Sequence, residues 1–104
     1  MPVITYILDN RGNPVAESDF DRWCEWYGTH DRTVKYDELS EDIAVSTVFL
    51  GVDINLSGRA PPQLWETVIL GGPHDQYQRR YASRAAALES HDAALKLARG
   101  KTLH

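Results

Sequence analysis

The chain has 104 residues, of which 42% are hydrophobic and 25% charged, and this size and composition are typical of one globular domain without room for a second core. We therefore expect residues 1–104 to form a single domain. No apolar run approaches the roughly 20 residues that a membrane-spanning helix requires, and residues 1–8 carry neither a basic leader nor a small-residue cleavage site. We expect a cytoplasmic protein that does not contact a membrane.

The formal net charge of −4 at pH 7 is unevenly distributed. Residues 1–53 hold eleven acidic and four basic residues, whereas residues 54–104 hold four acidic and seven basic residues. Because neutralisation of phosphates supplies most of the affinity for nucleic acids, we do not expect direct nucleic-acid binding. The acidic half is typical either of an ordinary solvated surface or of a surface that faces a basic groove on a protein partner.

The first 50 residues predict a strand, a helix and two further strands. Residues 3–8 (VITYIL) are rich in β-branched and aromatic residues and predict a strand, which the turn residues of segment 9–14 end. Ser18 is expected to cap a helix over residues 19–27 that ends at Gly28. Residues 33–36 predict a short polar strand, and the apolar run 43–50 (IAVSTVFL) predicts a central strand.

The helix over residues 19–27 has its apolar residues at positions i, i+3, i+4 and i+7, and they predict one packed face: Phe20, Trp23, Cys24 and Tyr27. Trp26 lies beside this stripe and is expected to be partly exposed. Cys24 is the only cysteine, so an internal disulfide is excluded. We interpret Cys24 as a small buried hydrophobic residue in preference to a reactive thiol.

The second half predicts a loop, a hairpin and a helix. Residues 51–62 are loop-like, and strands over residues 64–70 and 76–81 flank a Gly-Gly-Pro-His-Asp turn. Ser83 is expected to cap an alanine-rich helix over residues 84–99 that stops at Gly100. Short links between successive strands favour an antiparallel meander. We therefore predict an α+β fold, in which an antiparallel sheet of four or five strands carries two helices packed on it.

No motif indicates a particular reaction. The four histidines lack the i, i+4 spacing of a helical metal site, and no phosphate-binding loop is present, so we expect neither a metal nor a cofactor. Four ionisable residues are nevertheless the candidates for a small enzyme or ligand-binding domain: Asp53, Glu66, His74 and His91. Structural roles are favoured for three of them, namely packing and hydrogen bonding for His91, turn geometry for His74, and an ion pair with Arg79 or Arg80 for Glu66.

The run STVFLGVD, followed by PPQLWETVILGGPHDQYQRRYASRAAALESH, resembles a group of small, mostly uncharacterised proteins encoded by bacteriophages and prophages. The motifs that carry the resemblance are residues 46–51, 65–67, 71–73 and 80–84, together with His91. Where that group is expected to have an Asp-His pair, this chain has Asp53 followed by Ile54. The resemblance implies a phage origin and no established activity.

From these features we predict a phage accessory protein that binds and modulates a bacterial host protein, such as a component of a defence system, in the host cytoplasm. The short length, the charge asymmetry and the aromatic content of the chain favour a binding protein over an enzyme. A homodimer is left open. The residues predicted to contact the partner are Asp19, Asp21, Trp26, Glu41 and Asp42.

Overall fold

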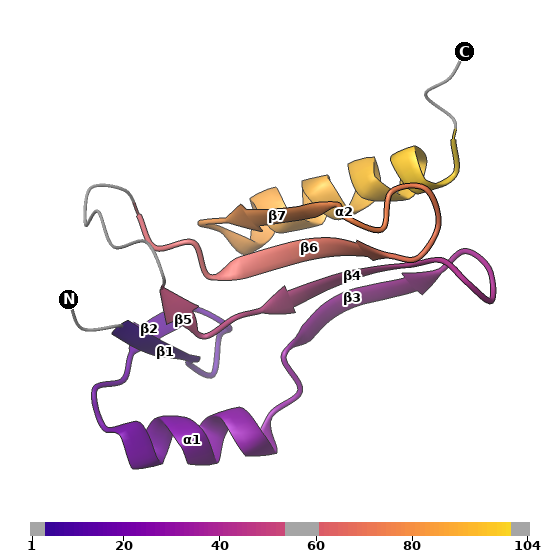
Figure 1. The fold of residues 1–104 in the computed structure, drawn as a ribbon. Coiled ribbons are helices and arrows are strands. Elements are labelled where there is room, and N and C mark those ends of the chain that lie inside the picture. The colour runs from indigo at the N-terminus through magenta and orange to yellow at the C-terminus, as the bar shows by residue number, and fades with distance from the viewer. Residues whose placement is uncertain (1–3, 54–60, 101–104) are drawn as a thin grey trace.

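The computed structural model describes residues 4–53 and 61–100, which form two antiparallel sheets and two helices (Figure 1). The larger sheet has the order β3-β4-β6-β7, formed by β3 (Thr33–Glu38), β4 (Ala44–Phe49), β6 (Trp65–Leu70) and β7 (Gln78–Tyr81). The smaller sheet has the order β2-β1-β5, formed by β2 (Pro14–Ala16), β1 (Ile4–Leu8) and β5 (Val52–Asp53). The predicted α+β class with antiparallel sheets and two helices is confirmed, but the strands divide between two sheets, and α2 (Arg84–Ala98) packs on the larger sheet whereas α1 (Phe20–Thr29) packs on the smaller one.

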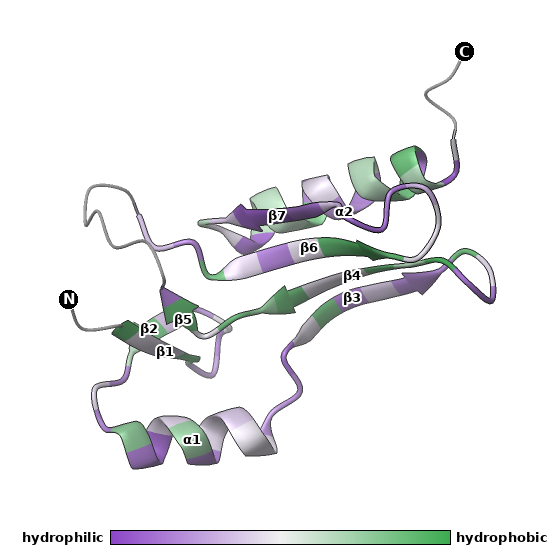
Figure 2. Ribbon diagram, viewed as in Figure 1, coloured by the Kyte–Doolittle hydropathy of each residue, from purple (hydrophilic) through white to green (hydrophobic). Residues whose placement is uncertain are grey.

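The two central strands of the larger sheet follow a two-residue alternation of burial. β4 and β6 pair along their whole lengths, with Thr47 opposite Thr67, and the residues of both strands that face helix α2 (Arg84–Ala98) are buried. Figure 2 shows hydrophobic residues concentrated in β4 and β6, whereas β7 is hydrophilic. Because successive side chains of a strand point to opposite faces, this alternation places the core between the sheet and α2.

Two hydrophobic clusters make up that core. One joins Val45 and Ile69 of the sheet to Ala94 and Leu95 of α2. The other cluster lies at the end of the sheet near the smaller sheet and consists of Phe49, Leu64, Trp65 and Ala87, with Tyr6, Leu8 and Trp26 packed against it.

The second helix forms as the sequence predicts. The hydroxyl of Ser83 accepts a hydrogen bond from the Ala86 N–H at 3.1 Å and so satisfies one of the free amides at the start of α2. Gly100 follows the helix with φ of +72°, the left-handed conformation that commonly ends a helix. Neither helix of the described residues has the length and apolar character needed to cross a membrane.

The first helix, α1 (Phe20–Thr29), differs from its prediction in its boundaries. The carboxylate of Asp19, and not the hydroxyl of Ser18, caps the helix by accepting hydrogen bonds from the N–H groups of Asp21 and Arg22. The helix also continues through Gly28, so this glycine does not end it.

The face that α1 presents to the rest of the protein also differs from the prediction. Phe20 is 64% exposed and Cys24 is exposed, so the interpretation of Cys24 as a buried residue is wrong. The helix packs on β1 of the smaller sheet, where the indole N–H of Trp23 lies 3.1 Å from the carbonyl oxygens of both Tyr6 and Gly51. The orientation of α1 is therefore set by the hydrogen bonds of Trp23 and by the packing of the half-buried Trp26. A continuous apolar stripe does not set it.

The smaller sheet was only partly foreseen. Residues 14–16 form a hairpin strand with β1, and Val52–Asp53 pair with β1 on its other side inside the segment predicted to be a loop. The rest of that predicted loop, residues 54–60, lies outside the described residues.

Candidate functional site: an open sheet face with an acidic end

One face of the larger sheet is covered by α2, and neither helix packs on the other face within the described residues, since α1 lies on β1. We call this second face the open face. Its side chains come from cross-strand neighbours on β3, β4, β6 and β7, and they mix apolar and polar residues: Tyr36, Glu38, Ala44, Ser46, Val48, Glu66, Val68, Leu70, Gln78 and Arg80. Tyr36 is 50% and Leu70 is 47% exposed. Tyr36 and Leu70 lie on β3 and β6, on either side of β4, and large apolar side chains exposed on one sheet face are typical of an interaction surface.

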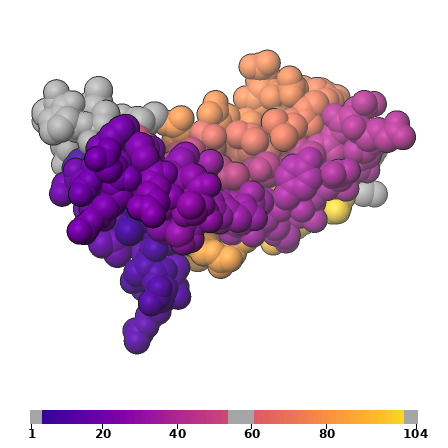
Figure 3. Space-filling model, turned by 90° about the horizontal axis from the view of Figure 1, so that it is seen from below, coloured from indigo at the N-terminus to yellow at the C-terminus, as the bar shows by residue number. Residues whose placement is uncertain are grey.

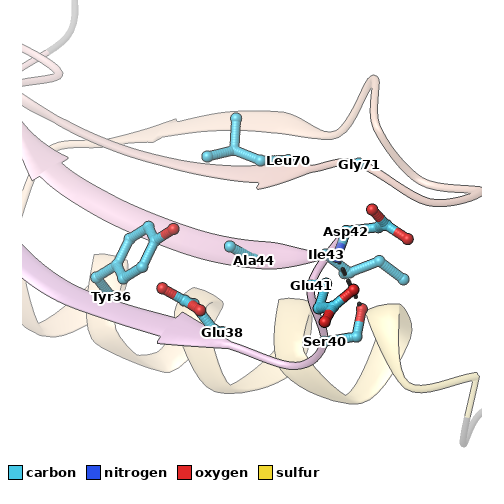
Figure 4. A pocket seen from close by; sticks show the side chains of 9 residues that line it. All are labelled: Tyr36, Glu38, Ser40, Glu41, Asp42, Ile43, Ala44, Leu70 and Gly71. Atoms are coloured by element: carbon cyan, nitrogen blue, oxygen red, sulfur yellow. Dashed lines mark hydrogen bonds between the residues drawn. The ribbon is translucent and has the colours of Figure 1, made fainter.

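The open face is hollowed at the end where β3 turns into β4. A pocket of about 300 Å³ lies there, and Figure 4 shows Tyr36, Ala44 and Leu70 arranged along its sheet side. The carboxylates of Glu38, Glu41 and Asp42 also line it. We call this hollow, with its apolar floor and its three carboxylates, the acidic pocket.

Contact between two turns fixes the shape of the acidic pocket. Gly71 starts the β6–β7 turn with φ of +83°, and a Cβ at this position would lie 1.8 Å from the carbonyl oxygen of Asp42. The Gly71 N–H donates to Oδ1 of Asp75 at 2.6 Å, which holds the turn closed. Gly72 packs in a similar way against Ile43. Only glycine fits at Gly71, because both the backbone angle and the close approach exclude a side chain.

The residues predicted to bind a partner lie in two separate places. Glu41 and Asp42 line the acidic pocket. Asp19 and Asp21 lie at the start of α1, which Figures 1 and 3 show at the end of the molecule away from the β3–β4 turn. Trp26 is half-buried, with its ring 5.9 Å from that of Phe49 and 4.7 Å from that of His30. The prediction missed Tyr36 and Leu70, although the alternation along their strands places both on the face opposite α2.

The four ionisable residues of the enzyme alternative do not converge. Glu66 lies on the open face and pairs with Nε of Arg80 at 3.0 Å, which confirms the expected cross-strand pair. His91 lies on the opposite side of the same sheet, Asp53 is in the smaller sheet, and His74 is in the β6–β7 turn. No group of three histidine, cysteine or acidic residues within residues 4–53 and 61–100 is arranged to hold a metal ion.

A chain of buried polar groups runs from the surface into the core beneath α2. His91 is fully buried, and its Nε2 lies 2.8 Å from Oδ2 of Asp37 while its Nδ1 lies 2.7 Å from Oγ1 of Thr47. The Thr47 hydroxyl lies 2.7 Å from that of Thr67, which in turn is 3.4 Å from the carbonyl oxygen of Ala87. The expectation of a packed, hydrogen-bonded His91 is confirmed.

The order of carboxylate, imidazole and hydroxyl in this chain resembles that of a hydrolytic relay, in which the hydroxyl attacks a substrate. Thr47 and Thr67 are 0% exposed, however, and a nucleophile must reach its substrate. The buried polar chain is therefore suited to joining α2 to β3, β4 and β6. Two tyrosines add to this attachment, because the hydroxyls of Tyr77 and Tyr81 both contact that of Ser90 on α2.

A second hollow, of about 700 Å³, lies between α1 and the β1–β2 turn and is lined by Ile7, Leu8, Asp9, Asn10, Gly12, Trp26, His30 and Asp31. The backbone N–H of Thr33 donates to Oδ1 of Asp31 at 2.9 Å, and this hydrogen bond lowers the pKa of the Asp31 carboxyl. The carboxylate of Asp31 is thus held charged by local backbone geometry at the rim of this hollow.

No protein-family model matches the chain, and neither a curated protein nor a solved structure matches it significantly.

Proposed function

We propose that this protein works by binding another protein at the acidic pocket and the adjoining open face. The observation that carries the proposal is the exposure of Tyr36 and Leu70 on a sheet face that neither helix of the described residues covers, next to three carboxylates. Apolar groups of this kind supply affinity when a partner removes them from water. The carboxylates at the rim select a partner with basic side chains and accelerate its association.

The pocket has the character of a site for one long basic side chain. A lysine or arginine can lay its apolar stem against Tyr36 and Leu70 while its charged end meets Glu38, Glu41 or Asp42. These carboxylates come from one short hairpin, so their fields add at the same place. The partner proposed here is accordingly a protein with an exposed arginine or lysine flanked by apolar residues.

The identity of the partner as a bacterial host protein depends on the resemblance to phage-encoded proteins alone. On that basis we propose that the protein acts in the cytoplasm of a bacterial host and modulates the protein that it binds, for instance a component of a defence system. Inhibition would follow if the acidic hairpin occupied a basic groove that normally receives phosphates.

The test uses charge reversal with a matched control. The double variant Glu41→Lys and Asp42→Lys places two positive charges at the acidic pocket, whereas Asp21→Lys together with Glu25→Lys makes the same change on α1. Tagged wild-type protein and both variants would be expressed in bacteria, and proteins retained in stoichiometric amounts would be quantified by mass spectrometry.

We expect the wild-type protein and the α1 variant to retain the same partner, and the pocket variant to lose it. The purified pair should also bind more weakly as salt rises, with the change mainly in the association rate. The substitution Leu70→Ser should weaken binding without changing that salt dependence. Equal retention by the wild type and the pocket variant, or the absence of any stoichiometric partner, would contradict the proposal.

A further inference from the structure

The outer edge of β3 is the second surface of interest. β3 is the first strand in the order β3-β4-β6-β7, and β4 is the only helix or strand of the described residues with which it is in extended contact. Figure 3 shows the molecule from the side on which β3 lies, and the residues that follow α1 reach the surface there. An uncovered edge strand presents unpaired N–H and C=O groups to another strand.

The pairing of β3 with β4 determines which of these groups point outward. The Leu39 N–H donates to the carbonyl oxygen of Ile43 at 2.8 Å, so residue 39 belongs to the set that bonds to β4. Hydrogen-bonded and non-hydrogen-bonded positions alternate in an antiparallel pair, so Asp37 and Lys35 also bond to β4. The backbone groups of Tyr36 and Glu38 therefore point away from the sheet.

From this pattern we infer that β3 pairs with β3 of a second copy of the chain, in antiparallel orientation and centred on Tyr36. The two sheets then form one eight-stranded sheet with both copies of α2 on the same side. In this register Tyr36 lies opposite Tyr36 of the partner copy, and their outward N–H and C=O groups bond to each other.

Charge selects this register over its neighbours. With Tyr36 at the centre, Lys35 of each copy lies opposite Asp37 of the other, which gives two attractive pairs. Sliding the partner strand by two residues in either direction moves the centre of the pairing by one residue and places Lys35 opposite Lys35, or Asp37 opposite Asp37. Like charges directly opposite each other destabilise a strand pair, whereas opposite charges stabilise it. Of the three registers centred on Lys35, Tyr36 and Asp37, only the one centred on Tyr36 brings opposite charges together.

Both charged groups are accessible for this pairing. The Lys35 side chain is 43% exposed, with its Nζ 3.5 Å from Asp92, and the Asp37 side chain is 40% exposed although its Oδ2 contacts His91. The second carboxylate oxygen of Asp37, Oδ1, is the acceptor that Lys35 of the other copy would meet. The only irregularity of the strand lies between Thr33 and Lys35, so the segment from Lys35 to Glu38 is regular.

The inference is tested on the protein alone, so its outcome is independent of the proposed partner. Sedimentation of the wild type over a wide concentration range measures self-association. Lys35→Glu places a carboxylate opposite Asp37 and should shift the dimer towards monomer by at least tenfold in dissociation constant, while Lys96→Glu on α2 should leave it unchanged. Rising salt should weaken the dimer as well.

A crosslink reports the register. In a Cys24→Ser background, Tyr36→Cys puts two thiols on residues whose Cα atoms are about 5.5 Å apart, within the range that a disulfide spans. Glu38→Cys puts its thiols four residues out of register, about 13 Å apart along the strands. We expect the residue 36 variant to crosslink on oxidation and the residue 38 variant to remain uncrosslinked. A wild type that is monomeric at every concentration, or crosslinking at residue 38 in preference to residue 36, would overturn the inference.

Discussion

Replacement of Thr47 by valine tests the buried polar chain directly. Valine has the shape of threonine without the hydroxyl, so packing is nearly preserved while two contacts of 2.7 Å, to Thr67 and to His91, are lost. Nδ1 of His91 then remains fully buried without a partner. An unsatisfied buried polar group costs about 1–3 kcal/mol, and we expect the free energy of unfolding to fall by about that amount.

For a chain of this size, each kcal/mol corresponds to a change of about 4–8 °C in the midpoint of thermal unfolding. Urea unfolding followed by tryptophan fluorescence measures the loss. Ser46→Val is the matched control, because Ser46 is the neighbouring residue of β4 on the open face and should change stability by no more than about 0.5 kcal/mol.

A double variant separates the free-energy cost of leaving Nδ1 of His91 without a partner from the other effects of Thr47→Val. His91→Leu removes the imidazole that Thr47→Val leaves without a partner, so the double variant should lose less stability than the sum of the two single variants, by about 0.5–3 kcal/mol. If Thr47→Val is as mild as Ser46→Val, or if the two single losses add without coupling, the buried chain does not hold α2 to the sheet as described.

Three further predictions follow from single positions. Gly71→Ala should lower stability and displace the β3–β4 turn, because its methyl group would meet the carbonyl oxygen of Asp42; unchanged thermal unfolding would contradict this. Burial raises the pKa of the Tyr81 phenol, so the neutral form is favoured in the folded state. Stability from this residue should be present below its unfolded pKa of about 10 and lost as pH rises through the folded value. Tyr81→Phe should abolish that alkaline loss, measured by urea unfolding at rising pH. Cys24 should react with a thiol reagent in the native protein at the rate seen in denaturant, whereas protection would contradict its exposure.

The strand pattern of the larger sheet could be predicted from the sequence because it depends on local alternation. β6, and β4 from Val45 onward, bury every second residue, and the β6–β7 turn carries the Gly-Gly-Pro signal. The cap at Ser83 was equally local, since one hydroxyl and the amides of the next turn decide it.

The sequence could not show how α1 attaches. Its residues have the spacing of an amphipathic helix, but the surface that it meets is a small sheet built from β1 and β5, which are far apart in the chain. Contacts to that sheet orient the helix by Trp23, so Cys24 and Phe20 remain exposed. The partner of His91 was missed for the same reason, because Asp37 lies 54 residues away in the sequence.

The candidate site was half predicted. The excess of acidic residues in the first half of the chain predicts Glu41 and Asp42 as partner-binding residues, and both line the acidic pocket. Charge alone could not distinguish them from Asp19, whose carboxylate is engaged in capping α1. Tyr36 and Leu70 are recognised only when the position of α2 shows which face of the sheet is left open.

No residue of α1 is fully buried, and this determines which part of the protein unfolds locally. Unfolding of this helix exposes the half-buried sides of Trp23, Trp26 and Tyr27 but no fully buried side chain, so it requires less free energy than separation of α2 from its sheet. Amide protons of α1 should therefore exchange with solvent by partial opening, while those of β4 and β6 exchange only when the whole chain unfolds. Helix α1 can thus unfold and refold locally while α2 and the larger sheet keep their structure.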